Sequence, residues 1–77
     1  MAIGLVFIST APAKEHDVHT EISKVKEIVE LHPLFGDYDL IAKVEADNHN
    51  LLSQIVMNKI RTIPGVIDTK TLMGIKL

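Results

Sequence analysis

The stretch Leu34-Phe35-Gly36-Asp37-Tyr38-Asp39-Leu40-Ile41-Ala42-Lys43-Val44 decides how this chain folds. It begins at the end of one strand and continues into a second, mostly apolar strand. Between them, Gly36 can adopt a positive φ without steric cost, and Asp37 can close a turn through its side chain. The stretch therefore predicts a β-hairpin. Its turn carries two carboxylates and a phenol beside backbone N–H groups, which could bind a small zwitterion or simply solvate a loop.

The composition limits the size of the fold. The chain has 77 residues, of which 47% are hydrophobic, and it contains no cysteine. This length predicts one domain, residues 1–77, with a single small core. The apolar fraction is more than such a core readily hides. It indicates either a dense aliphatic core or apolar surface buried between subunits, and we favour the second because small domains without disulfides often gain stability from self-association.

The charge balance argues against two classes of partner. Eight basic and ten acidic residues give a net charge of −2, with no basic run and few aromatic residues for base stacking. Direct binding to nucleic acid is therefore not expected. The apolar opening, residues 1–8, is too short to span a membrane and lacks the basic start of a secretory signal. We expect a cytoplasmic protein.

The first elements are a strand and a helix. Residues 2–10 form a continuous apolar run, which predicts a strand buried on both faces in the middle of a sheet. Alternation divides its apolar side chains between the two faces, with Ile3, Leu5 and Phe7 on one and Val6 and Ile8 on the other. A helix is expected to open at Thr10 or Pro12, with Glu15 and Asp17 near the positive end of its dipole.

The residues alone leave the end of this first helix open. Apolar residues recur at helical spacing within residues 18–25, and the same periodicity continues to the break at Pro33. One interpretation extends the helix to that break. The other ends the helix near Ser23 and makes residues 27–32 a strand. Pro33 would then have to lie at the sheet edge, where a missing N–H is tolerated.

The second half of the chain predicts a strand, a helix and a strand. Residues 39–46 form a strand with Leu40, Ala42 and Val44 on one face and Lys43 and Glu45 on the other. Asp47 and Asn48 start a helix, because either side chain can accept from the free N–H groups of the first turn. That helix places six apolar residues on one broad face and ends at Pro64-Gly65. The six are Leu51, Leu52, Ile55, Val56, Ile60 and Ile63.

Residues 66–77 are expected to close the chain as a strand. Ile67, Thr69, Thr71 and Met73 would share one face, with Asp68 and Lys70 on the other. The complete order is strand, helix, strand, strand, helix, strand. It predicts an α+β, ferredoxin-like fold, with a four-stranded antiparallel sheet and both helices on one face. The other face of the sheet would be covered by a second subunit.

No residue pattern predicts catalysis or metal binding. The chain has no cysteine, its serines lack a nucleophile motif, and no glycine-rich loop follows a strand. His16 and His19 have the helical spacing at which two imidazoles can share a metal, but no third ligand is near them in sequence. Asp37 and Asp39 lack the partners that a catalytic carboxylate pair needs. We expect no catalytic residue, metal or cofactor.

The hairpin and two later segments carry a resemblance to a known family. Residues 36–44, followed by Ile63-Pro64-Gly65-Val66 and Thr69-Lys70-Thr71, resemble the C-terminal effector (RAM) domain of the Lrp/AsnC transcription regulators. The resemblance spans essentially all 77 residues. The family's N-terminal helix-turn-helix domain is absent, so the chain resembles the stand-alone form. The resemblance also places residues 27–35 in a strand and ends the first helix near Ser23.

The resemblance implies a ligand and a site. Family members bind free amino acids at the interface between dimers, and occupancy changes their assembly or their affinity for partners. The residues carried over by position are Leu34, Phe35, Gly36, Asp37, Tyr38, Asp39, Thr69 and Thr71. Backbone N–H groups of the glycine turn would donate to the α-carboxylate, Asp39 would pair with the α-ammonium, and the threonine hydroxyls would complete the site.

The resemblance also implies partners. We expect a homo-oligomer of dimers, assembled into an octamer or a similar ring, which binds an amino-acid effector. It would co-assemble with full-length Lrp/AsnC regulators and so act on transcription indirectly. Two other interpretations are a structural oligomerisation module without ligand and a small ferredoxin-like enzyme, such as an acylphosphatase-like hydrolase. The chain lacks the phosphate-binding first loop, with its arginine, that such a hydrolase has.

One residue departs from the family pattern. Phe35 stands where the family usually has a small polar residue, and Pro33 and Leu34 precede it. This predicts a more apolar pocket floor, suited to a branched or aromatic ligand, or else an occluded site.

Overall fold

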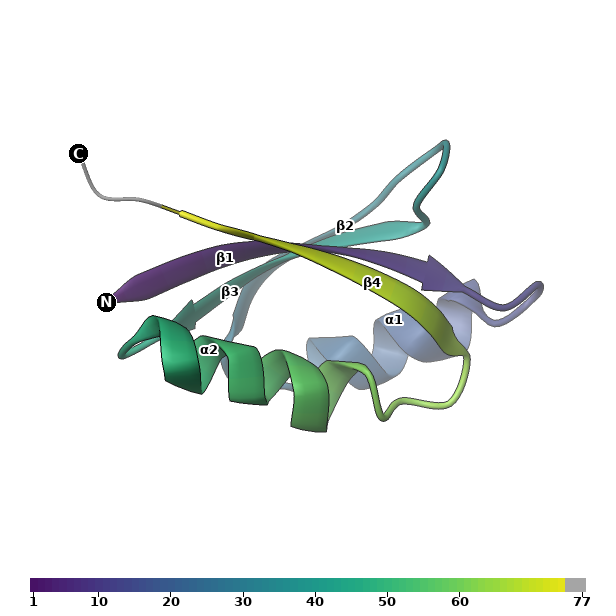
Figure 1. The fold of residues 1–77 in the computed structure, drawn as a ribbon. Helices are drawn as coiled ribbons and strands as arrows, with labels where there is room; N and C mark the ends of the chain where they lie inside the picture. Colours follow the sequence, from purple (N-terminus) through teal and green to yellow (C-terminus); the bar gives the residue numbers. More distant parts are fainter. Residues whose placement is uncertain (75–77) are drawn as a thin grey trace.

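The computed structural model describes residues 1–74 and has the expected ferredoxin-like α+β architecture (Figure 1). Its elements are β1 Ala2–Thr10, α1 Glu15–Ser23, β2 Ile28–Pro33, β3 Leu40–Ala46, α2 His49–Ile55, the π-helix η1 Val56–Ile60, and β4 Val66–Met73. The strands pair antiparallel in the order β2-β3-β1-β4. Both helices cover one face of the sheet. The other face carries no element of the described chain.

The core lies between the sheet and the helices. The central strands supply alternate side chains to it, and each helix supplies a buried stripe. Its largest fully buried side chains are Ile8, Ile22, Leu52, Ile60, Val6, Val18 and Val44. The period-two pattern predicted for β1 and β3 is confirmed, because Val6, Ile8, Leu40, Ala42 and Val44 all face the helices and are buried.

The opposite side of the sheet presents apolar side chains to solvent. We call it the open face, and it consists of Ile3, Leu5, Phe7, Ile41 and Leu72, with Tyr38 beside them. Ile3, Leu5 and Leu72 are 37%, 39% and 48% exposed. The central strand is therefore apolar on both sides, as its sequence predicts, but only one side is covered within a single chain.

Strand β2 forms one edge of the sheet and ends at Pro33. The N–H of Leu34 donates to the carbonyl oxygen of Asp39 at 2.8 Å. Since inward and outward positions alternate along an antiparallel pair, the nitrogen of Pro33 points away from β3. A missing donor costs nothing there. The edge position required by the shorter-helix interpretation is thus confirmed, although β2 stops before Leu34 and Phe35, two residues earlier than the resemblance implied.

The first helix starts later than predicted. We expected it to open at Thr10 or Pro12, but β1 continues through Thr10 and α1 begins at Glu15. A turn intervenes, in which Ala13 adopts a φ of +66° and the N–H of Lys14 donates to the Ala11 carbonyl at 3.0 Å. Pairing of Thr10 with β4 extends the strand, and this long-range contact has no local sequence signal.

The second helix is capped as predicted, but it is not regular. The side chain of Asn48 accepts from the N–H of Leu51 at 2.7 Å. After Ile55 the helix widens into η1, where the N–H of Arg61 donates to the carbonyl of Val56 at 2.9 Å. This i to i+5 bond replaces the α-helical bond to residue 57. Leu51, predicted on the buried face, is 39% exposed.

The last strand is shorter than predicted and contains an irregularity. β4 ends at Met73, and residues 75–77 of the expected strand lie outside the described part of the chain. A register shift pairs Ser9 with Asp68 but Thr10 with Val66. Val66 therefore packs against the core, and Ile67, predicted to share a face with Thr69, is 66% exposed.

Candidate functional site

Asp39 joins the base of the hairpin to the end of β1 through hydrogen bonds. Its Oδ2 accepts from the backbone N–H of Thr10 at 2.7 Å and from the Thr10 hydroxyl at 3.1 Å. Its own N–H donates to the carbonyl of Ile8 at 2.8 Å. The Ser9 hydroxyl also donates to the carbonyl of Asp37 at 3.4 Å. These bonds hold the turn at the end of the central strand, where the sheet meets the start of α1.

The tip of the hairpin leaves polar and apolar groups free. Gly36 has a φ of +140°, and no atom lies within 4 Å of the position that a Cβ would take. Within residues 1–74, the backbone N–H groups from residue 35 to residue 38 donate to no carbonyl. The Phe35 side chain is fully exposed, at 107%. The predicted apolar pocket floor was expected between dimers, so it stays a prediction, and in the single chain the Phe35 side chain extends into solvent.

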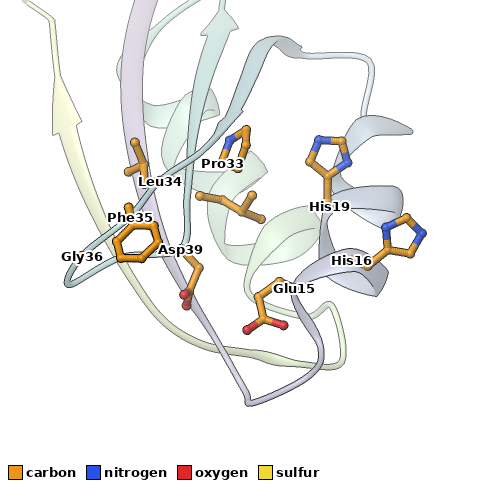
Figure 2. A pocket seen from close by; sticks show the side chains of 9 residues that line it. Glu15, His16, His19, Pro33, Leu34, Phe35, Gly36 and Asp39 are labelled. Atoms are coloured by element: carbon orange, nitrogen blue, oxygen red, sulfur yellow. The ribbon is translucent and has the colours of Figure 1, made fainter.

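A hollow of about 610 Å³ lies between the hairpin and α1 (Figure 2). We call it the hairpin hollow, and its lining comprises Glu15, His16, His19, Pro33, Leu34, Phe35, Gly36, Asp39 and Leu40. In Figure 2, Glu15 points from α1 into the space in front of Asp39. Glu15 is exposed to water, and Asp39 is half-buried. Two carboxylates therefore give this hollow a negative character.

Tyr38 does not enter the hairpin hollow. Its ring packs against Phe7, with the ring centroids 5.6 Å apart and the planes at 51°. Phe7 belongs to the open face, so Tyr38 extends that apolar surface. Tilted aromatic pairs of this kind add stability beyond their buried area. The hairpin thus contributes to two surfaces at once.

Thr69 and Thr71 line a different hollow on the helix side of the sheet. They pair with the buried residues Ile8 and Val6 of β1, so they face η1 rather than the open face. This strand hollow has a volume of about 260 Å³. Its lining comprises Ser53, Val56, Met57, Arg61, Thr69, Thr71 and Met73. Within residues 1–74, no side-chain hydrogen bond is made by its three hydroxyls or by Arg61.

The structure thus distributes the eight predicted ligand residues over separate places. Leu34, Phe35, Gly36 and Asp39 lie together in the hairpin hollow, whereas Thr69 and Thr71 lie in the strand hollow. Asp37 and Tyr38 line neither. Sequence reasoning missed Glu15, Ser53 and Arg61. A helical face containing Ser53 could have been noticed, but the π-turn that determines the position of Arg61 has no sequence signal.

Two carboxylates elsewhere on the surface have altered acidity. The hydrogen bond from Lys59 lowers the pKa of Glu27, and its two N···O distances are 3.1 and 3.0 Å. The pKa of Glu30 is lowered by a hydrogen bond with His32 and by the charge of Lys43, at 3.3 and 3.6 Å. Neither group lines the hairpin hollow or the strand hollow.

The two histidines considered as metal ligands both lie on α1. His16 is exposed and His19 is half-buried, and both line the hairpin hollow. In residues 1–74, no three His, Cys, Asp or Glu side chains are grouped so as to hold a metal ion. Nor does this part of the chain contain a helix of the length and apolar character that crossing a membrane requires.

Comparison with known proteins identifies the family. The family model described as the Lrp/AsnC ligand binding domain matches residues 3–76. The HTH-type transcriptional regulator FL11 of Pyrococcus horikoshii is 30% identical over 74 residues, which cover 96% of this chain and 48% of that protein. The chain therefore spans about half the length of this regulator.

Two further relatives differ in size. The crystal structure of FFRP-DM1 superposes with a TM-score of 0.92 at 35% identity, covering 97% of this chain and 100% of that chain. A homocitrate synthase of Sulfurisphaera tokodaii is 46% identical over 55 residues, which are 71% of this chain and 11% of the enzyme. The matching fold, the hairpin and the match over residues 3–76 show that the chain belongs to the Lrp/AsnC family, in its ligand-binding domain.

Proposed function

We propose that the chain is a self-associating regulatory module that senses a free amino acid in the cytoplasm. The ligand would lie between two copies, with the hairpin hollow of one facing the strand hollow of the other. The module would act on transcription indirectly, through a ring of dimers or by co-assembly with longer Lrp/AsnC regulators. We assign no catalytic step to it.

The separation of the two hollows is the observation that carries this proposal. Each hollow offers groups that suit one part of an amino acid: free backbone N–H groups and carboxylates in the first, hydroxyls and a cation in the second. Within one chain the hollows are built by different elements and have no lining residue in common. We therefore propose that a ligand that uses both sets is held by two copies.

Exposed apolar groups support self-association. Ile3, Leu5 and Leu72 are more than one third exposed on the open face, and Phe35 is fully exposed at the hairpin tip. Exposed apolar groups gathered on one side are typical of surfaces that contact another protein. The open face would join two chains into a dimer, and the hairpin tips would join dimers to one another.

The relatives support a role in sensing rather than in DNA contact. The matching segment occurs in regulators named HTH-type and also in a homocitrate synthase, of which it forms a small part. A segment shared by a regulator and a biosynthetic enzyme fits a function that both can use. Ligand-dependent assembly is such a function, and the chain's lack of a basic surface run fits it as well.

A thermal-shift screen against the twenty amino acids at millimolar concentration tests the proposal, with the size of the assembly measured beside each hit. A ligand present at about 100 times its dissociation constant stabilises the bound state by about 2.7 kcal/mol, which raises Tm by roughly 10 to 20 °C in a domain of this size. A shift with one amino acid or a related group is expected. An oligomer that no amino acid stabilises would instead be a structural assembly module.

Mixing two variants tests whether the site is shared between copies. Asp39→Asn keeps an acceptor for Thr10 but removes the charge, and Thr69→Val/Thr71→Val removes both hydroxyls at nearly constant shape. Each variant alone should lose ligand stabilisation. Refolded together, they should regain part of it, since some sites combine an intact hairpin with an intact strand hollow. No recovery in a mixed oligomer would show that a single chain holds the ligand.

A further inference from the structure

Arg61 is the only arginine of the chain, and it lines the strand hollow together with Thr69 and Thr71. We infer that Arg61 is a specificity-determining residue, and that the ligand is an amino acid whose side chain ends in a second carboxylate. This inference rests on the proposed function, because it assumes that the strand hollow receives the ligand's side chain.

The backbone of Arg61 is fixed while its side chain is free. Its N–H closes the π-turn by donating to the carbonyl of Val56 at 2.9 Å, a hydrogen bond that spans one residue more than an α-helical bond. Lys59, the cation within η1, is paired with Glu27 at 3.0 Å. Arg61 forms no ion pair with any residue between 1 and 74. Its charge therefore remains available to a ligand.

The other residues of the strand hollow favour an anion. Three hydroxyls, from Ser53, Thr69 and Thr71, can each donate a hydrogen bond, and no acidic side chain is among the lining residues. An ammonium group in this hollow would meet Arg61 with no carboxylate to offset the repulsion. A ligand side chain ending in a cation is therefore disfavoured.

A purely apolar ligand side chain is disfavoured for a different reason. It would cover the guanidinium group and the hydroxyls without offering an acceptor, and polar groups that lose water without a new partner cost free energy. A carboxylate satisfies them, and arginine can bind it through two parallel hydrogen bonds. The apolar rim, Val56, Met57 and Met73, can contact the methylene groups that carry the carboxylate.

The dimensions agree with this orientation of the ligand. The strand hollow, at about 260 Å³, has less than half the volume of the hairpin hollow, at about 610 Å³. The hairpin hollow is larger, and its acidic groups suit an α-ammonium. The strand hollow thus fits one end of the ligand. The inference therefore differs from the expectation of a branched or aromatic ligand, which was based on Phe35 in the hairpin rather than on the strand hollow.

Isothermal titration with charged and amide pairs of equal shape tests the inference. The ligands are L-glutamate against L-glutamine and L-aspartate against L-asparagine, at fixed ionic strength. The oligomer should prefer one of the acids over its amide by about tenfold or more, as charged hydrogen bonds predict. Arg61→Gln should abolish that preference while the assembly size stays unchanged, and Arg61→Lys should retain part of it.

Lys26→Gln is the matched control. Lys26 is exposed in the connection between α1 and β2 and lines neither hollow, so this variant removes the same charge away from the site. It should keep the preference for the acid. Equal affinity for acid and amide, or a preference that survives Arg61→Gln, would overturn the inference and leave the proposed function standing. If no amino acid binds the oligomer at all, the proposed function fails and this inference fails with it.

Discussion

At the scale of single residues, Asp39 has a structural role that the nearby Asp37 lacks. Asp39→Ala should lower the free energy of unfolding by about 1 to 3 kcal/mol, because the N–H and hydroxyl of the buried Thr10 lose their shared acceptor. Asp37→Ala is the control. Its side chain is exposed and accepts no hydrogen bond from residues 1–74, so urea unfolding should show a change below about 0.5 kcal/mol. Equal effects of the two substitutions would contradict this role.

Gly65 is required for two reasons that can be measured separately. Its φ is +101°, and a Cβ there would lie 2.9 Å from Cγ2 of the buried Val18. Gly65→Ala should therefore destabilise the chain by about 1 to 3 kcal/mol through strain, with a further loss from the clash. Gly36→Ala gives the strain alone, since φ is +140° there and the space is open. Thermal unfolding should rank Gly65→Ala as the more damaging change.

Single residues also show where sequence reasoning stops. It selected Gly36 correctly as the pivot of the turn, because a positive φ is a local property. It expected the side chain of Asp37 to close the turn, but the side chain that accepts hydrogen bonds there is that of Asp39, and its partner Thr10 is distant in sequence. It could not identify Arg61, whose position depends on a π-turn, or Glu15, which reaches the hairpin hollow only through the packing of α1 against the sheet. The predicted sharing of a ligand among the eight residues stays a prediction.

At the scale of elements, the Glu27–Lys59 pair ties the connection between α1 and β2 to η1. Lys59 lowers the pKa of Glu27 below its ordinary value of 4.5, so the pair contributes stability above that pH and loses it as the pH falls through the lower folded-state pKa. Glu27→Gln should cost about 0.5 kcal/mol at pH 7, since Glu27 is only 18% exposed but Lys59 is 45% exposed.

The pH dependence distinguishes this pair from a general effect of the substitution. Urea unfolding of the natural chain and of Glu27→Gln should give stabilities that converge as the pH falls below 4.5, because protonated Glu27 no longer attracts Lys59. A difference that stays constant across that pH range would show that the charge of Glu27 contributes nothing. Lys24→Gln, which breaks only the exposed pair with Glu21, should have a smaller effect at every pH.

Element type was easier to predict than element ends. A continuous apolar run identified β1, alternating residues identified β3, and the capping residues Asp47 and Asn48 identified the start of α2, since these patterns follow directly from strand and helix geometry. The end of α1 needed the family resemblance, because residues 18–31 fit helical spacing throughout. The widening of α2 and the register shift in β4 depend on contacts between elements, so local patterns could not reveal them.

At the scale of the whole molecule, the open face should control assembly. Leu5→Glu places a charge in the middle of this face and should convert the oligomer to smaller species at micromolar concentration, as measured by sedimentation. Leu51→Glu is a matched control, because Leu51 is also 39% exposed but lies in the first turn of α2, where an acidic residue is favourable. If both variants assemble like the natural chain, the open face is not the interface.

The two edges of the sheet are unlike, and this difference limits how chains can add to one another. The outer edge of β2 is short, contains a register irregularity, carries Glu30 and His32, and lacks a donor at Pro33. The outer edge of β4 runs over eight residues without proline. Fibre growth by strand addition needs an accepting edge on both sides of every sheet. A chain with one accepting edge can pair with one other chain only. We therefore expect that strand addition does not extend this protein into β-sheet fibres, even at high concentration.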